Sequence, residues 1–531
     1  MTGMTLLPRR SAPTRRLHGY LIAAMLLLSA EGLWGAGPPE QPPTFKHRPV
    51  AGAADHFDVP YLPDRRTGRA WQDRWVTLNV HVPTGAEGSR ACIVFVHGGG
   101  YGGGDKDGGY RGAGGPPHAL LEQAVREGFV AVNLNYILNI APDGIFPQVW
   151  LDFKNAVRFL RANAGRYRID PARIAAWGFS AGGWLAGSGS FTTADDTHRA
   201  PRTGPAADWH VRRQRDQHLL LPLDDPRTTQ VDQSSRLAAI VADFWPNRHL
   251  NLYSADDPAV LTCVGSGAEH ELVRLARRVG NEGVALVLTD PRFAGKASLH
   301  VPPVDSPCRT LDGSGRSTLK DEAFAWLKRR LVDAPRAVPP EARPIRRVFA
   351  DVAAVRLLAA SPADRIRYTL DGSEPTEKSL VYSAPFTVAQ TTTVKAVVEA
   401  DGFAPSAVAT FTFTKGQPPP MIQGPDRLPL ATVGQPYSVR FEPSGPGEYT
   451  WNVGSHATPE VKMHTKGYVK PPLGLLLDAK TGTLSGTPTQ AGAFTVTVHL
   501  ARGLGQLADV RTYVLLVAAG ESDGRRPADE K

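Results

Sequence analysis

The hydrophobic positions of residues 55–333 fall into short apolar runs separated by stretches with helical spacing. Continuous apolar runs of this length are typical of strands buried on both faces. The runs are WVTLNVHVP, ACIVFVHG, FVAVNLNY, IAAWGFS, LAAIVADFW, AVLTCVG and VALVLTD. Between them, VWLDFKNAVRFLRANA places Phe153, Val157 and Leu160 on one helix face, and LKDEAFAWLKRRL is a last helical stretch. The alternation predicts an α/β domain over 55–333, with a mostly parallel sheet covered by helices on both faces.

The helical spacing disappears after residue 333. The proline-rich segment 334–344 predicts a linker, since its residues favour extended conformations over helices or strands. Beyond it, Ile366, Tyr368 and Leu370 alternate with polar residues and precede an Asp-Gly turn. A strict two-residue alternation followed by such a turn is typical of hairpins. We therefore predict a small antiparallel β-sandwich over 345–415.

A second β domain follows a second proline-rich linker, which covers 416–424. In it, Phe494 and Val496 begin an alternation with threonines that again indicates half-buried strands. We predict a β-sandwich over 425–518 and a charged tail over 519–531.

The first 37 residues differ from the rest of the chain. Arginines precede the apolar run LIAAMLLLSA, and small residues follow it, as in a signal peptide. We predict a signal peptide over 1–37, a linker over 38–54 and export to the periplasm or the medium. An uncleaved anchor is the alternative, although the run is short for a membrane span. No later segment is apolar enough to predict a span after cleavage.

Two glycine-rich motifs follow predicted strands. HGGGYGGGDK begins at His97 after ACIVFV, and GFSAGG begins at Gly178 after IAAW. In G-x-S-x-G, a serine occupies a strained turn between a strand and a helix, and the flanking glycines allow close packing. We predict Ser180 as the nucleophile of an acyl-transfer site. The alternative is an ordinary serine in a strand–helix turn.

The upstream glycines predict donors for a negative oxygen. Acyl transfer passes through a tetrahedral intermediate that backbone N–H groups stabilise. We assign this role to Gly99 and Gly100, together with Ala181 after the nucleophile. The run also fits G-x-G-x-x-G, but no helical pattern follows it and the next strand ends in Asn rather than an acidic residue. We therefore exclude a dinucleotide site, and no cofactor or metal is implied.

With these motifs in view, residues 75–333 resemble the α/β-hydrolase fold, in the esterase and lipase branch with an HGGG loop that includes exported carbohydrate esterases. Through IRYTLDGSEPT and TTTVKAVVEADGFAPS, residues 345–414 resemble the chitobiase C-terminal type of β-sandwich. Through LDAKTGTLSGTPTQAGAFTVTV, residues 425–518 resemble an immunoglobulin-type domain. The resemblance implies an α/β-hydrolase sheet followed by two small all-β sandwiches.

The resemblance also implies a serine, an acid and a histidine in this chain order. His300 in KASLHVPP is the predicted base, and a surface-loop histidine is the alternative. The family's acid loop reads HGTxD, whereas this chain reads VGSGAEHE, with Ala268 near the expected Asp. We predict Glu269 as the acid and keep Asp243, at the end of LAAIVAD, as its alternative.

These assignments predict an exported serine esterase that cleaves acetyl or feruloyl esters on a polysaccharide through an acyl-enzyme. The alternatives are a serine peptidase on the same fold, and a degenerate esterase acting as a non-catalytic carbohydrate-binding or adhesion protein. We interpret the polar segment 195–233 as an insertion over the active-site end, with disorder as the alternative. The sandwiches contain one tryptophan, Trp451, for which a core role is expected, so we interpret them as spacers.

Charge and cysteine content change this picture little. The net charge is +9, but several arginines lie in the signal and the others are scattered, so no nucleic-acid partner is predicted. Of the three cysteines, Cys92 and Cys263 fall in apolar runs and are predicted to be buried thiols. An oxidising compartment would permit a disulfide between Cys263 and Cys308.

Overall fold

A computed structural model of the 531-residue chain gives the arrangement of most of its residues. The predicted signal peptide, most of the predicted insertion, most of the charged tail and His300 lie outside the described residues. The described residues are 46–62, 76–85, 87–101, 103–108, 116–136, 138, 148–191, 230–243, 253–297, 299, 301–344, 347–418, 420–425, 428–453, 474–502 and 506–520.

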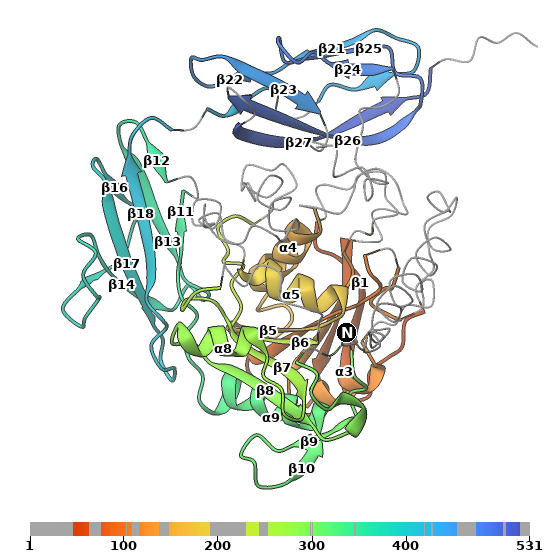
Figure 1. Cartoon of the computed structure of the whole chain (residues 1–531), viewed down its shortest axis with the longest axis vertical. Coiled ribbons are helices and arrows are strands. Elements are labelled where there is room, and N and C mark those ends of the chain that lie inside the picture. The colour runs from red at the N-terminus through yellow and green to blue at the C-terminus, as the bar shows by residue number, and fades with distance from the viewer. Residues whose placement is uncertain are drawn as a thin grey trace, which may run out of the picture. The chain divides into compact units, whose positions relative to one another are not determined.

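The first domain is built on a ten-stranded sheet with the order β1-β2-β4-β3-β5-β6-β7-β8-β9-β10 (Figure 1). Neighbouring strands from β4 to β8 run parallel, and the outer pairs are antiparallel. The strands are β1 (Ala53–Pro60), β2 (Thr77–Pro83), β3 (Arg90–Val96), β4 (Val130–Leu134), β5 (Ile169–Phe179), β6 (Ala239–Asp243), β7 (Ala259–Gly265), β8 (Gly283–Leu288), β9 (Pro307–Arg309) and β10 (Arg316–Thr318). Every apolar run predicted as a strand forms one of them, which confirms the predicted α/β fold.

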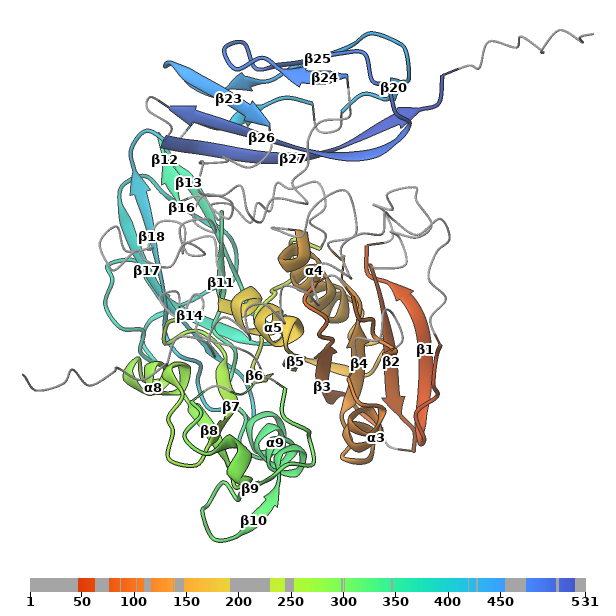
Figure 2. The same ribbon diagram turned by 45° about the vertical axis from the view of Figure 1, so that its right-hand side comes forward.

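Helices cover both faces of this sheet, as the continuous apolar strands predict. Along β3, Val94 packs in one core with helices α4 (Gln148–Ala162) and α5 (Ala181–Phe191). Its neighbour Phe95 packs in the other core, with α3 (His118–Arg126) and α9 (Leu319–Lys328). Figure 2 shows these helices around the strands. Burial on both sides leaves no position of β2 or β7 exposed.

The predicted linker 334–344 is partly a strand. Residues Glu341–Arg343 form β11, which pairs with β13 (Ala353–Leu358) of the first sandwich. The Glu341 carboxylate accepts hydrogen bonds from Ser234 Oγ at 2.9 Å and from Ser235 N at 2.8 Å. The sandwich therefore begins before residue 345, and its first strand is bonded to the α/β domain.

The first sandwich consists of two sheets that enclose one core. The smaller has the order β11-β13-β16 and the larger β12-β18-β17-β14-β15. Strand β17 alternates strictly between buried and half-buried positions, as its sequence predicts. The remaining bounds are β12 (Val348–Phe349), β14 (Arg365–Thr369), β15 (Leu380–Val381), β16 (Phe386–Val388), β17 (Thr392–Glu399) and β18 (Ala409–Lys415).

The second sandwich has a four-stranded sheet β20-β27-β26-β23, a three-stranded sheet β21-β25-β24 and a pair β19-β22. Trp451 lies in its core and is 3% exposed, which confirms the core role predicted for it. The bounds are β19 (Ile422–Gln423), β20 (Ala431–Thr432), β21 (Tyr437–Arg440), β22 (Glu442–Pro443), β23 (Tyr449–Val453), β24 (Leu475–Leu477), β25 (Thr483–Gly486), β26 (Gly492–Arg502) and β27 (Gln506–Ala518).

The disulfide between Cys263 and Cys308 is a wrong prediction, because all three cysteines are free and buried. Cys263 lies on β7 and Cys308 on β9, and β8 runs between these two strands. The described residues contain no helix that is both long and apolar enough to cross a membrane.

Candidate active site

The turn between β5 and α5 holds Ser180 in a strained conformation. Its φ is +51°, in the left-handed region that costs free energy for a residue with a side chain. A Cβ on Gly178 would lie 2.3 Å from the Gly182 carbonyl oxygen. A Cβ on Gly182 would lie 2.2 Å from the Val96 carbonyl oxygen. The two glycines of G-x-S-x-G are therefore required by backbone packing, and they leave Ser180 only partly buried.

The glycine loop after β3 lies directly against this turn. A Cβ on Gly98 would be 3.1 Å from Ser180 Cβ and 3.0 Å from the Phe179 carbonyl oxygen, so Gly98 lies next to the serine turn and leaves little room for a side chain. Gly99 and Gly100 have φ values of +113° and +59°, which glycine adopts readily. The predicted donor loop and the predicted nucleophile are thus neighbours, although the donor roles of Gly99, Gly100 and Ala181 stay predictions.

The loop also folds back on itself. Gly103 N donates to Gly99 O at 3.1 Å, and a Cβ on Gly104 would lie 2.3 Å from Gly98 O. Tyr101 joins the loop to helix α5, because its hydroxyl donates to the Ala181 carbonyl at 3.0 Å. The sequence pattern did not single out Tyr101, since one tyrosine among glycines has no recognisable spacing.

His97, the first residue of the motif, has a structural position. Its ring stacks on Tyr136 at 4.2 Å and 7°, and Nδ1 lies 2.7 Å from the Gly98 carbonyl oxygen. The Tyr136 hydroxyl donates to the His97 carbonyl at 2.9 Å. Burial lowers the pKa of His97 to about 4, so its side chain is neutral at ordinary pH. These contacts fix the start of the loop.

The predicted acids lie at the same edge of the sheet as Ser180, because parallel strands end together. Asp243 is the last residue of β6 and pairs with Phe179, the residue before Ser180. Glu269 lies between β7 and helix α8 (Glu271–Arg278), and its side chain is 56% exposed. Its carboxylate is 3.9 Å from the Arg277 guanidinium. The acid of a catalytic triad is usually buried, so this exposure does not support Glu269 as the acid that orients the histidine.

His300 lies outside the described residues, but the loop that leads to it can be followed. After β8, Lys296 O accepts a hydrogen bond from Gly265 N, and Ser266 O accepts one from Gly295 N, both at 2.8 Å. A Cβ on Gly265 would lie 1.5 Å from Phe293 O. The loops after β7 and β8 are therefore joined, while a contact between Ser180, Glu269 and His300 stays a prediction.

His270, beside Glu269, has a structural position. Its Nδ1 accepts a hydrogen bond from Leu272 N at 3.2 Å and so caps the N-terminus of α8. Its side chain is buried, and burial lowers its pKa to about 4. A buried cap of this kind does not fit a catalytic base.

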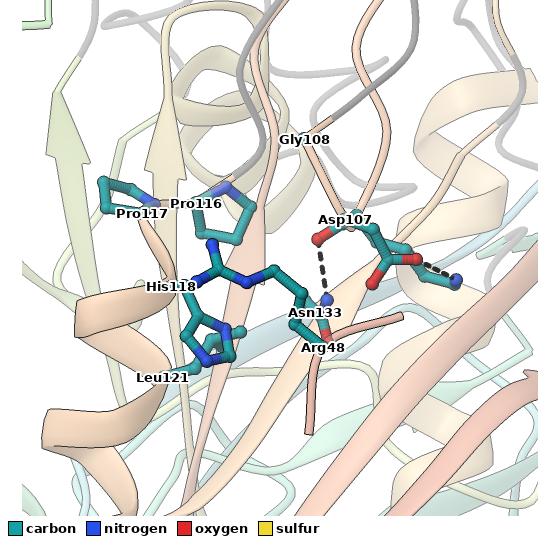
Figure 3. A pocket seen from close by; sticks show the side chains of 9 residues that line it. Arg48, Asp107, Gly108, Pro116, Pro117, His118, Leu121 and Asn133 are labelled. Carbon is teal, nitrogen blue, oxygen red and sulfur yellow. Dashed lines mark hydrogen bonds and ion pairs between the residues drawn. The ribbon is translucent and has the colours of Figure 1, made fainter. Parts of the chain in front are cut away.

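A pocket of about 220 Å³ lies next to the far end of the glycine loop. Figure 3 shows Asp107 and Gly108 of the loop facing Asn133 of β4, with Arg48 and His118 at another wall. Lys106 also lines the pocket. The polar pair Asp105-Lys106 ends the HGGGYGGGDK motif, so it is visible in the sequence, but its spacing alone indicates no role.

Three segments of the chain match known families. Residues 78–258 match the BD-FAE family, residues 355–413 match the Fn3 associated family, and residues 419–518 match the He_PIG family of Ig domains. No curated protein matches the chain.

Several solved structures are similar to about half of this chain. A truncated carbohydrate esterase from gut microbiota shares 17% identity over 48% of this chain and 90% of that one, with a TM-score of 0.32. Propionate-bound esterase 2 of Thermogutta terrifontis shares 18% identity over 47% of this chain and 85% of that one, with a TM-score of 0.30. A bifunctional GH43-CE protein of Bacteroides eggerthii shares 17% over 52% of this chain and 38% of its own length, with a TM-score of 0.34.

Likenesses this weak carry no conclusion about activity or substrate, so the assignment rests on the family matches and on the resemblance of the motifs. Both agree on an esterase-type hydrolase domain followed by two β domains. The chain therefore contains an α/β-hydrolase domain that matches the BD-FAE family, followed by an Fn3-associated domain and an Ig-like domain.

Proposed function

We propose that this protein is an exported serine esterase that removes small acyl groups, acetyl or feruloyl, from a polysaccharide. The observation that carries the proposal is the close approach of Gly98 to the strained Ser180, where the predicted donor loop lies beside a partly buried serine. A nucleophile and preformed backbone donors are the two parts that ester cleavage by serine requires.

In the proposed reaction, Ser180 Oγ attacks the ester carbonyl while His300 takes its proton. The carbonyl electrons move to the oxygen, and the N–H groups of Gly99, Gly100 and Ala181 stabilise the resulting anion. His300 then gives the proton to the leaving sugar hydroxyl, and an acyl-enzyme remains. Water, activated by the same histidine, releases the acid and restores the serine. Glu269 or Asp243 would orient the histidine.

The substrate class is supported by association. The two β domains resemble modules that frequently accompany exported polysaccharide-active enzymes, and an association of this kind indicates a setting rather than a mechanism. Export itself rests on the sequence pattern of residues 1–37.

The test is hydrolysis of p-nitrophenyl acetate, p-nitrophenyl butyrate and methyl ferulate by the wild type and by Ser180→Ala. We expect activity that Ser180→Ala abolishes. Ser190→Ala is the matched control, because Ser190 lies on helix α5, which follows Ser180, and its hydroxyl donates to the Ala186 carbonyl. Release of acetate from acetylated xylan would then test the polysaccharide. Equal rates for the wild type and Ser180→Ala would contradict the proposal.

The exposure of Glu269 favours one second candidate, a degenerate esterase that binds carbohydrate without cleaving it. Without an orienting acid, the rate would fall by roughly four orders of magnitude. This candidate predicts retention of the wild type on insoluble acetylated xylan together with hydrolysis at the background rate. Turnover that depends on Ser180 would exclude it.

A further inference from the structure

A buried ammonium group lies two residues beyond the glycines of the donor loop. The Lys106 side chain is fully buried, and its Nζ lies 2.8 Å from Asp58 Oδ1 and 2.8 Å from Asp107 Oδ2. A buried charge is tolerated only where opposite charges and hydrogen bonds replace its water. The two carboxylates therefore hold this side chain in one place.

Both carboxylates are themselves held by neighbours, Asn79 on β2 and His47 in the segment before β1. Asp107 accepts a hydrogen bond from Asn79 Nδ2 at 2.9 Å, and His47 lies between the two carboxylates, 3.2 Å from Asp107 and 3.0 Å from Asp58. Burial raises the pKa of Asp58, but the charges and hydrogen bonds of Lys106 and His47 outweigh it and lower the pKa. We call Lys106, Asp107, Asp58, His47 and Asn79 the Lys106 cluster.

The backbone of Lys106 is fixed as firmly as its side chain. Its N–H donates to Asn135 Oδ1 at 2.7 Å, and its carbonyl accepts from Asn133 Nδ2 at 2.7 Å. Asn133 lies on β4 and Asn135 directly follows it, so both bonds connect the loop to the sheet. Figure 3 shows Asn133 and Asp107 on this wall of the pocket. The far end of the glycine loop is therefore attached to the strand next to β3.

A short chain of contacts runs from this attachment to the nucleophile. Gly104 packs on the Gly98 carbonyl, and Gly98 packs on Ser180. A shift of Lys106 would be passed to Gly104, and from there to the residues that carry the donor N–H groups. We propose that Lys106 is a positioning residue, whose buried cluster keeps the Gly99 and Gly100 N–H groups where the negative oxygen forms. This inference rests on the proposed esterase function.

The first test variant is Lys106→Met, which removes the charge and keeps most of the chain length. Preorganised donors act in the transition state, and a displacement of about 1 Å can cost roughly 100-fold in rate. We expect kcat for p-nitrophenyl acetate to fall by about 10- to 100-fold, while KM stays within about twofold. Affinity for an alkylboronic acid, which forms a tetrahedral adduct on serine, should fall in parallel with kcat.

Lys106→Met leaves two carboxylates without their cation, so a milder variant is needed. Asp58→Asn keeps the side-chain volume and the Lys106–Asp107 pair, and we expect it to lower kcat by about three- to tenfold. Arg236→Met is the matched control. It removes a mostly buried cation whose guanidinium lies 2.8 Å from the Asp256 carboxylate. Arg236 precedes β6, so it lies at the opposite edge of the sheet from Ser180. It should lower the unfolding temperature without changing kcat or the boronic acid affinity.

The outcomes separate this inference from the esterase proposal. If Ser180→Ala abolishes activity and the folded Lys106 cluster variants keep wild-type kcat and boronic acid affinity, the positioning role is overturned while the esterase stands. If Lys106→Met does not fold, Asp58→Asn decides, and a wild-type kcat for Asp58→Asn overturns the role. If the wild type has no Ser180-dependent activity, both proposals fail.

Discussion

Two loops at the same edge of the sheet are built in different ways. The loop after β3 is defined by its backbone, because extra carbon atoms at Gly98, Gly99 or Gly104 would meet carbonyl oxygens or the nucleophile's turn. In the loop after β7, Gly265 N donates to Lys296 O and Gly265 O accepts from Ala268 N, but the candidate acid Glu269 has a largely exposed side chain. The functional groups predicted for the loop after β3 are backbone N–H groups, whereas the group predicted for the loop after β7 is a side-chain carboxylate.

This difference explains why the two halves of the site are unequally well defined. A backbone site needs glycine at particular positions, so the sequence records it as a motif. A side-chain site needs only a carboxylate within reach of a histidine, which several positions can provide.

Gly182→Ala should have the largest effect. Its Cβ would lie 2.2 Å from Val96 O and 2.3 Å from His97 O, so α5 would have to move away from β3. We expect the free energy of unfolding to fall by about 3 kcal/mol or more and activity to disappear. Urea denaturation measures the first effect. Gly165→Ala is the control, because nothing lies within 4 Å of its Cβ position. Equal stability of the two variants would contradict the packing argument.

The acid should be revealed by paired substitutions. Glu269 is exposed, so we expect Glu269→Gln to lower kcat less than tenfold, and Asp243→Asn to lower it by about three to four orders of magnitude. Steady-state hydrolysis of p-nitrophenyl acetate at pH 7.5 gives both values. A loss of three orders of magnitude in Glu269→Gln would restore Glu269 as the orienting acid and show that the loop closes around substrate.

Stability should fall as the pH falls, because each loop contains a buried histidine. Burial lowers the pKa of His97 and His270 to about 4, below the ordinary value of 6.5. Between these values the unfolded chain binds protons that the folded chain cannot, so stability is full above about pH 6.5 and falls toward pH 4. At pH 5, each histidine should lower the free energy of unfolding by about 2 kcal/mol.

His270→Asn isolates the contribution of the β7 loop to this pH dependence. Asparagine keeps a cap for α8 and does not titrate. Urea denaturation at pH 7.5 and pH 5 should show a pH-dependent loss that is about 2 kcal/mol smaller than in the wild type. An unchanged difference between the two pH values would mean that His270 is not neutral and buried in solution.

Tyr101→Phe should have the smallest effect. It removes the hydroxyl that joins the glycine loop to α5. We expect kcat to fall by about three- to tenfold and the free energy of unfolding to fall by about 1 kcal/mol. Tyr253→Phe is the control, since the Tyr253 hydroxyl donates to Pro258 O at 2.9 Å, before β7 and away from Ser180. It should lose similar stability and keep kcat. Equal losses of kcat would mean that Tyr101 acts only on folding.

The sequence predicts the parts of this molecule that depend on apolar periodicity or glycine. Each predicted strand of the parallel region exists, and the turn at Ser180 has the predicted glycine packing. The outer strand β1 was not predicted, because it is mostly half-buried and contains polar residues throughout. Strand β11 was interpreted as a linker, since its partner β13 and the serines that bind Glu341 are distant in sequence.

The Lys106 cluster could not be predicted for the same reason. Its members come from the segment before β1, from β1, β2 and the glycine loop, and the order of these strands is not written in any local pattern. A buried lysine looks like a surface lysine in sequence. Side chains that meet only through the topology of the sheet require the structure.

The most direct test of the central claim is covalent labelling of the folded protein by a fluorophosphonate. Attack by a serine hydroxyl on phosphorus expels fluoride and leaves a stable phosphonyl ester, which peptide mass spectrometry can locate. We expect one adduct per chain, on the peptide that contains Ser180, and no adduct in Ser180→Ala, with Ser190→Ala labelled as the wild type is. An unlabelled wild type, or equal labelling in Ser180→Ala, would contradict the assignment of Ser180 as an activated nucleophile.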